Sequence, residues 1–469
     1  MSHPSSQPAI IVAPPLDINN TNPIDQDATI LTGEADEIIH YREYEPGKRY
    51  YGTNRYVEYI CGNLPIIITV PHGGYAHPSH LPDRAGGCHV PDIGTQELAR
   101  LLYEEFDRQL GANQRSTLSE SGSSSQTLHY YPHMILNRLQ RGPLDMNRNE
   151  IDASGGNPET RHAWRQFHAF VRRAKREVVR GRSVTNMEWR KKMATTTDSS
   201  TSSVSTSAVA ASSVPHWSRC LYLDLHGQSH DRRHQLGYIL NQQELYQHND
   251  QQLDESIELI NKSSLRCAVE PVRHESTSSS GAVSSPSPSS SPSLSSPHSR
   301  SSLSSILRGS TSFGAMLEAR GQKCVPSPTS TNAGSPGSIM YFNGGYNTHV
   351  HSGAISGTRQ REKERQAKKE EEETSSNQSS TSAVPVKSST VVDEDEAFTH
   401  LFDTSLESDY FIGIQLESAY EGARDTPKNI SLFASQLCAS MVQFVCTHVL
   451  TEEDQLTTTT TASATTASN

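Results

Sequence analysis

The chain is poor in apolar residues for its length. Of its 469 residues, 33% are hydrophobic and 6% are aromatic. This is too little to fill one core of that size. We therefore expect part of the chain to lie outside any folded domain.

The segments that lack apolar residues can be located in the sequence, because they consist mainly of Ser, Thr, Ala, Pro or charged residues. Such segments cannot offset the entropy of ordering their backbone. They predict disordered insertions at about 192–214, 275–312 and 357–396, a disordered tail at 453–469 and a partly disordered N-terminal extension at 1–45. The remainder, within 46–452, is expected to be one domain of about 280–300 ordered residues.

Basic surface, paired cysteines and long apolar runs are also missing. The net charge of −11 argues against binding to nucleic acid, which requires a basic surface. Seven cysteines without CxxC pairs are more typical of reduced thiols than of a disulfide framework. No segment has the pattern of a signal peptide or a membrane span. We therefore expect a cytoplasmic protein that does not bind membranes, with phosphorylation-dependent partners or simple spacers as alternative roles for the Ser-rich insertions.

Short apolar runs alternate with amphipathic stretches along the rest of the chain. The apolar runs predict buried strands at 65–70, 133–137, 220–226, 236–240 and 410–417. The amphipathic stretches predict three helices: one from Asp92 as capping residue to Gly111, one over 159–179, and one over 429–450 capped by Asn429. Strands that alternate with helices favour an α/β fold, with helices on both faces of a mixed central sheet in three α/β/α layers.

Two histidines come at the ends of predicted strands. His72 follows the first run and is followed by two glycines, whereas His226 ends the third run and precedes Gly227, which we expect to turn the chain. Open α/β sheets bind ligands at the carboxyl ends of their strands. The two histidines are therefore expected to meet at one edge of the sheet.

The histidine pair suggests a metal site. Imidazole is a common zinc ligand, and a catalytic zinc site has three protein ligands. A carboxylate is the expected third ligand, with Asp92 as the first candidate, in the first turn of the helix after the His72 loop, and Glu97 as the second. The alternatives are a hydrogen-bonded turn for His72 and a helix cap for Asp92. We expect one Zn²⁺ per chain.

A second histidine pattern is rejected as a metal site. His226, His230 and His234 are spaced by four, as on a zinc-binding helix of the HExxH type. Gly227 disfavours a helix there, and no Glu follows the first histidine. His230 and His234 are therefore expected in loops or on the surface, where His230 could contact substrate.

Other strand ends carry groups suited to a substrate. Asn147 and Arg148 could hold a substrate carboxylate, because guanidinium forms a bidentate fork; the alternative is a salt bridge from Arg148 to Asp145. Glu417 ends the last strand, where burial can raise its pKa toward that of a general base; the alternative is a solvated Glu.

Two further features are candidates for substrate contact. Arg424 is expected either to bind substrate or to pair with Glu421. The glycine-rich segment 340–353, "MYFNGGYNTHVHSG", is expected either to close over the site or to form an ordinary turn.

Seven motifs in this order resemble one known family, the N-formylglutamate amidohydrolases: "VPHGGYAHP", "LPDR", "PDIGTQELARLL", "LNRLQRGPLDMNR", "YLDLHG", "FNGGYNTH" and "IQLESAYEGAR". The resemblance extends from about Pro65 to about Val449. It implies a fold related to zinc carboxypeptidases and aspartoacylases. It also implies a zinc-dependent hydrolase that cleaves the amide of a small N-acyl amino acid such as N-formylglutamate.

The resemblance assigns roles to the same strand-end residues. It implies metal ligation by His72, His226 and Asp92, with the substrate carboxylate at Asn147 and Arg148. It places Glu417 where the general base is expected. The alternatives are a metallocarboxypeptidase-like enzyme or another amide deacylase and, in a different class, a non-catalytic domain that recruits partners through its insertions.

Overall fold

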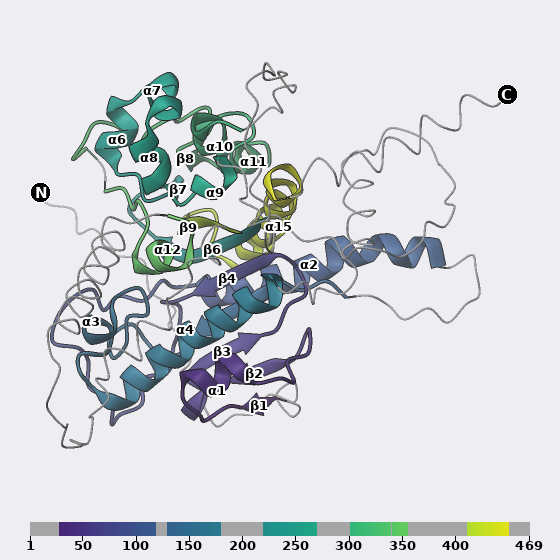
Figure 1. Cartoon of the computed structure of the whole chain (residues 1–469), viewed down its shortest axis with the longest axis vertical. Helices are drawn as coiled ribbons and strands as arrows, with labels where there is room; N and C mark the ends of the chain where they lie inside the picture. The colour runs from purple at the N-terminus through teal and green to yellow at the C-terminus, as the bar shows by residue number, and fades with distance from the viewer. Residues whose placement is uncertain are drawn as a thin grey trace, which may run out of the picture.

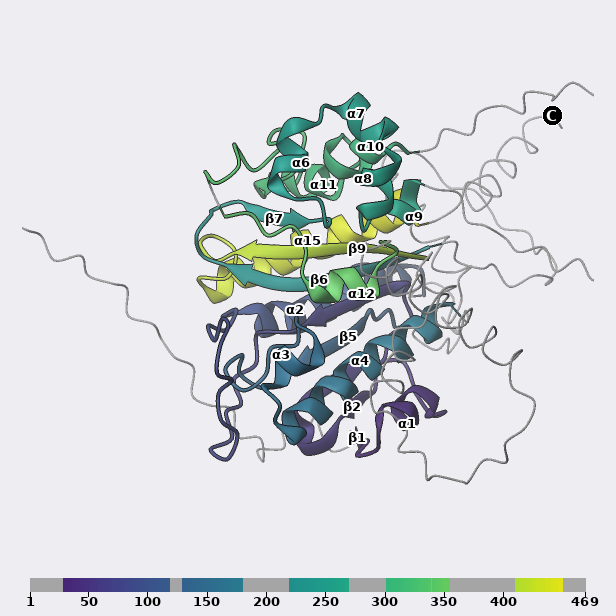
Figure 2. The same cartoon turned by 60° about the vertical axis from the view of Figure 1, so that its left-hand side comes forward.

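The computed structural model describes residues 28–118, 129–179, 219–269, 301–338, 340–354 and 410–449. The predicted insertions at 192–214 and 357–396 and the tail at 453–469 lie outside these residues, as does 275–300 of the remaining insertion. The described part is a mixed α/β protein built on a nine-stranded sheet (Figures 1 and 2).

The sheet contains a parallel centre flanked by antiparallel pairs. Its order is β1-β2-β3-β5-β4-β6-β9-β7-β8. The four strands β5, β4, β6 and β9 are parallel, while β3 and β7 run antiparallel to β5 and β9. The strands are β1 (Thr29–Ile30), β2 (Arg49–Tyr51), β3 (Val57–Ile60), β4 (Ile66–Val70), β5 (His133–Asn137), β6 (Cys220–Gln228), β7 (His234–Gly237), β8 (Cys324–Val325) and β9 (Phe411–Ala419).

Helices cover both faces of this sheet and gather at one of its ends. Figure 1 shows the short helices α6 to α11 together beside β7 and β8. The helices are α1 (Ala35–His40), α2 (Thr95–Leu118), α3 (Glu150–Ser154), α4 (Pro158–Val179), α6 (Gln242–Gln247), α7 (Asp250–Glu255), α8 (Ile257–Lys262), α9 (Arg266–Val269), α10 (Leu303–Arg308), α11 (Phe313–Glu318), α12 (Tyr346–His351) and α15 (Pro427–His448), with a 3-10 turn at Thr53–Arg55.

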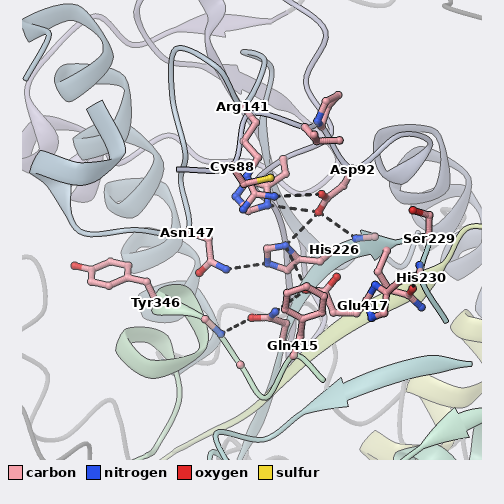
Figure 3. Close-up of a pocket in the computed structure, with 18 of the residues that line it drawn as sticks. Cys88, Asp92, Arg141, Asn147, His226, Ser229, His230, Tyr346, Gln415 and Glu417 are labelled. Carbon is pink, nitrogen blue, oxygen red and sulfur yellow. Dashed lines mark hydrogen bonds and ion pairs between the residues drawn. The ribbon is translucent and has the colours of Figure 1, made fainter. Parts of the chain in front are cut away.

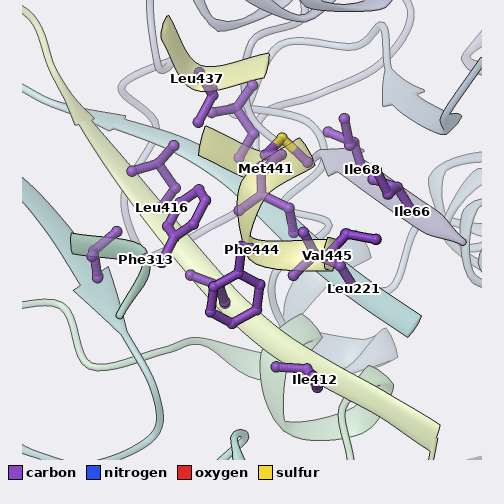
Figure 4. Packing of buried hydrophobic residues seen from close by; sticks show 14 of the residues in the cluster. Ile66, Ile68, Leu221, Phe313, Ile412, Leu416, Leu437, Met441, Phe444 and Val445 are labelled. Carbon is purple, nitrogen blue, oxygen red and sulfur yellow. The ribbon is translucent and has the colours of Figure 1, made fainter. Parts of the chain in front are cut away.

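The larger core cluster lies on the face covered by α2 and α15. Side chains of α15, among them Met441 and Phe444, pack onto strand residues such as Ile68 and Leu416 (Figure 4). A second cluster on the other face includes Trp164 and other side chains of α4 together with α1. Both faces of the central strands are therefore buried, which explains why these strands are continuous apolar runs.

The principal strands and helices were predicted from the sequence. The runs at 65–70, 133–137, 220–226 and 410–417 correspond to β4, β5, β6 and β9. The run at 236–240 is displaced, because β7 ends at Gly237. β1, β2, β3 and β8 had no clear apolar run, and α10 begins at Leu303, within the stretch assigned to the second insertion.

Three predicted helix limits are wrong. α2 begins after Gly94, whose carbonyl accepts from Leu98 N at 3.0 Å, so that Asp92 lies in the preceding loop. α2 also continues past Gly111 to Leu118, because one glycine costs a helix only about 1 kcal/mol. α15 is capped by Thr426, whose side chain accepts from Asn429 N, and Pro427 follows at its first turn.

α15 has the length and composition of a membrane-spanning helix. Of its most apolar window, 56% is buried inside the protein. Most of its apolar residues belong to the larger core cluster, as expected of a core helix, while Leu432 is 51% exposed.

Candidate metal and active site

Three parallel strands bring the predicted site residues to one edge of the sheet. His72 lies two residues beyond the end of β4, and His226 lies in the last part of β6. Glu417 of β9 is the direct neighbour of His226 in the strand register. The expectation that these strand ends meet is confirmed, because parallel neighbours end at the same edge.

His72, Asp92 and His226 form a buried group whose ligand atoms lie within 4.8 Å of one another and could hold a metal ion. Asp92 Oδ2 lies 3.4 Å from His72 Nδ1 and 3.2 Å from His226 Nδ1 (Figure 3). The ring centroids of the two histidines are 4.7 Å apart. Two imidazole nitrogens and one carboxylate oxygen thus converge on one point.

The opposite nitrogen of each imidazole is held by a second carboxylate. His72 Nε2 lies 2.6 Å from Asp145 Oδ1, and His226 Nε2 lies 2.9 Å from Asp224 Oδ2. A proton on each Nε2 leaves each Nδ1 as an acceptor, which is the form that binds a metal. His72 Nδ1 is buried and has no hydrogen-bond partner. A buried imidazole nitrogen without a hydrogen-bond partner, 3.4 Å from a carboxylate, is consistent with a group that could hold a metal ion.

The charges of the group stabilise one another. Burial acts to raise the pKa of Asp92, but His226 and His72 outweigh it and hold this pKa below its ordinary value. Burial acts in the same way on Asp145, whose pKa is lowered by His72 and Arg141. Burial lowers the pKa of His226, but Asp224 and Asp92 raise it well above its ordinary value. Without a metal, His226 therefore carries a proton that a metal would have to displace.

Glu417 is a buried carboxylate beside His226, and its pKa is raised. It is 5% exposed, and its Oε1 lies 4.0 Å from His226 Nδ1. Burial raises its pKa; His226 opposes and Asp92 reinforces this shift, which remains upward. Gln415 orients the carboxylate by donating to Oε1 at 2.8 Å. The alternative of a solvated Glu at this position is wrong.

A cavity of about 650 Å³ opens over this group. Its lining includes the predicted substrate residues Asn147, Arg148, Arg424 and His230, together with Glu417. Figure 3 shows Asn147 on one side of the metal-ligand group and His230 on the other. The structure thus brings every predicted site residue to one cavity, whose volume suits a small-molecule ligand.

Comparison of the chain with family models, curated proteins and solved structures finds no match. Its site is therefore assigned from its own geometry.

Asn147 and Arg148 occupy different surroundings. The Arg148 side chain is 45% exposed and lies 3.4 Å from Asp145 Oδ2, so the predicted salt bridge is present while the guanidinium still faces the cavity. Asn147 Oδ1 accepts from Asn347 N at 2.8 Å, and its amide nitrogen lies 3.3 Å from His226 Nε2. Arg148 is accordingly the more accessible group for a substrate carboxylate.

Arg424 binds the backbone of three segments at the site. It is 4% exposed and donates to the carbonyls of Ile93, Gln228 (3.1 Å) and Ser418 (3.0 Å). The expected pairing with Glu421 is wrong, because Glu421 pairs with Arg232 at 2.9 Å. Arg424 thereby joins the ends of β6 and β9 to the loop that carries Asp92.

Gly227 leaves room for the Arg424 side chain, and it does not turn the chain. β6 continues through Gly227 to Gln228, in register with Ala419, so the predicted turn is wrong. A Cβ at Gly227 would lie 2.4 Å from Arg424 Cζ. The glycine is therefore explained by the passage of the guanidinium across the strand.

The remaining alternatives are also resolved by position. Glu97 accepts from Tyr75 at 2.8 Å and does not belong to the metal-ligand group. His234 is buried in β7 and stacks on Phe433, so its predicted surface position is wrong. His230 is exposed, as expected, and its Nε2 lies 2.9 Å from Met340 O.

Sequence reasoning did not identify Asp224 or Gln415 as site residues. Each lies two positions before a proposed functional residue in the same strand, and alternate strand residues share a face. This period-2 pattern is the signal that could have found them.

Proposed function

We propose that the protein is a zinc-dependent amidohydrolase that cleaves the amide bond of a small N-acyl amino acid. One observation carries the proposal. The Nδ1 atoms of two histidines converge on Asp92 beside a buried Glu417, while each Nε2 is held by its own carboxylate. Three protein ligands with an adjacent carboxylic acid are the components of a catalytic zinc site.

His72, Asp92 and His226 would hold the metal, one per chain. When bound, zinc polarises a carbonyl and lowers the pKa of water. Nitrogen, nitrogen and oxygen donors in a buried site favour zinc over magnesium or calcium, which prefer all-oxygen sites. Zinc is therefore the metal proposed.

The chain's own residues supply the proton transfers and the substrate contacts. Glu417 takes a proton from the attacking water and delivers one to the leaving amine, for which its raised pKa suits it. Arg148 holds the substrate carboxylate from the cavity wall. Asp145 and Asp224 keep the proton of each imidazole on Nε2.

The proposal includes the finer fold and the family suggested by the sequence motifs. The parallel β5-β4-β6-β9 centre, with helices on both of its faces, supports a three-layer fold of the zinc-exopeptidase kind. Both fold and motifs favour the N-formylglutamate amidohydrolase family. Metallocarboxypeptidases would share the metal site and differ in substrate.

The decisive experiment is elemental analysis of the purified full chain beside His72→Ala and His226→Ala. We expect about one zinc per chain in the parent and loss of zinc from both variants. His129→Ala is the matched control, because this exposed histidine also pairs with an aspartate, Asp107, but lies outside the site. A parent that binds no zinc when it is supplied, or site variants that keep it, would refute the proposal.

A further inference from the structure

Part of the cavity is lined by apolar side chains that the proposed chemistry does not use. Nine large apolar side chains are exposed in the part of the chain that the structure describes, and three of them, Val90, Ile93 and Tyr420, line this one cavity. Ile93 is 40% exposed and Tyr420 is 39% exposed. Exposed apolar groups gathered at a ligand cavity are typical of a surface that a ligand covers.

Two of these side chains, those of Ile93 and Tyr420, belong to residues that both contact Arg424. Arg424 donates to Ile93 O and Gln228 O, and its Cζ lies 5.7 Å from the centre of the Tyr420 ring. Ile93 and Tyr420 are thus joined to the end of β6, which leads into Ser229 and His230. Figure 3 shows Ser229 and His230 on the side of His226 opposite Asn147.

A third aromatic residue extends the same side. Phe342 also lines the cavity, and its ring centre lies 5.5 Å from that of His230. Ile93, Tyr420 and Phe342 come from three separate segments, before α2, after β9 and before α12. We call these three side chains the apolar wall.

The cavity also has cationic side chains: Arg148, next to Asn147 in the chain, and Arg141, which lies 3.6 Å from Asp92 Oδ1. Arg148 and Arg141 both lie close to Asp145, at 3.4 Å and 3.2 Å, so two guanidinium groups share one carboxylate that also binds His72. Both arginines line the cavity. A substrate whose carboxylate binds Arg148 beside Asn147, with its amide at the metal ligands, directs its acyl group toward His230 and the apolar wall.

We propose that the acyl group of the substrate is an apolar chain of several carbons, held by the apolar wall. The inference rests on the proposed function and specifies its substrate class. A formyl group carries only hydrogen beyond the carbonyl and would leave the wall exposed to water. A longer alkyl or aryl group would cover it and gain the free energy of apolar burial.

The test measures kcat/KM of the zinc-loaded full chain for N-acetyl, N-butanoyl and N-hexanoyl amino acids, with glutamate and with leucine as the amine. The carbonyls of these three substrates are of similar reactivity, so differences report binding of the chain. We expect kcat/KM to rise about fourfold for each methylene group that the wall buries. N-formyl substrates complete the series.

The outcomes separate this inference from the proposed function. A rise from acetyl to hexanoyl supports the apolar wall, whereas a flat profile or a preference for acetyl or formyl overturns it and leaves the hydrolase intact. Cleavage of none of the substrates by a zinc-loaded chain would count against the proposed function itself.

Variants test the wall directly. Ile93→Ala should lower the hexanoyl-to-acetyl ratio roughly tenfold, because it removes methyl and methylene groups that the chain contacts. Tyr420→Ala is the second variant and covers the case in which Ile93→Ala does not fold. Ile257→Ala is the matched control, since Ile257 is 74% exposed and does not line the cavity. A ratio that is the same in both wall variants and in the control would refute the assignment.

Discussion

Replacement of Asp224 by Asn tests whether the outer carboxylates prepare the histidines for a metal. Asp224 Oδ2 lies 2.9 Å from His226 Nε2, while its Oδ1 accepts from Thr69 Oγ1 at 2.6 Å and from Asn347 Nδ2 at 3.3 Å. His226 Nε2 and Asn347 Nδ2 therefore each require an acceptor at this position. The third neighbour, the Thr69 hydroxyl, can reorient to donate or to accept. An asparagine offers one acceptor and one donor.

Either orientation of the new amide has a cost. If the amide nitrogen faces His226, Nε2 must accept, and the proton moves to the Nδ1 that should bind the metal. If the amide oxygen faces His226, the amide nitrogen opposes the donor Asn347 Nδ2 in a buried site. We expect Asp224→Asn to weaken zinc binding by about 10- to 100-fold, or about 1.4–2.7 kcal/mol.

The assay is competition with a chromophoric chelator at fixed pH and salt, after thermal melting has shown that the variant folds. Asp107→Asn is the matched control, because Asp107 holds His129 at the same 2.9 Å but away from the site. It should leave zinc affinity unchanged. A folded Asp224→Asn protein that binds zinc within twofold of the parent would refute the role of the outer carboxylate.

Three further predictions concern the base, the metal and acid stability. Glu417→Gln should keep its zinc but lower kcat by about two to four orders of magnitude, and unchanged turnover would remove Glu417 from the mechanism. Because the pKa of His226 is raised, zinc must displace a proton; its affinity should fall about tenfold per pH unit below that pKa, which titrations at several pH values will check. Burial lowers the pKa of His133 and of His168 to about 3, below the unfolded value of about 6.5. The unfolded chain therefore binds more protons below pH 6.5, and the free energy of unfolding should fall as the pH drops from 6.5 toward 3, by up to about 1.4 kcal/mol per pH unit for each histidine. Equal stability at pH 7 and pH 5 would contradict this.

The central sheet could be predicted from sequence because its strands are buried on both faces. Continuous apolar runs then mark β4, β5, β6 and β9, whose ends carry His72, His226 and Glu417. Strands at the edges of the sheet need not be buried on both faces, so they need not be continuous apolar runs. β1 and β8 are two residues long and left no pattern to find.

The site residues could be identified from the sequence, but the contacts that hold them in place could not be predicted. Asp92 was expected to begin a helix, yet it lies in a loop that accepts a hydrogen bond from Arg424 at Ile93 O. The close pass of Arg424 over Gly227 joins positions almost 200 residues apart and has no local signature. Such contacts are set by tertiary packing, which sequence patterns do not encode locally.

The place of β9 in the sheet has a consequence for biosynthesis. β9 is the last strand in the described chain, but it pairs with β6 on one side and β7 on the other. Before residues 411–419 are synthesised, no described strand joins β6 to the β7-β8 pair, and one edge of β6 and one edge of β7 lack their partner. Among the described strands, β9 alone pairs with both β6 and β7. Completion of the sheet and assembly of the site are thus a single event, because the strand that joins the two parts of the sheet also brings Glu417 to His226.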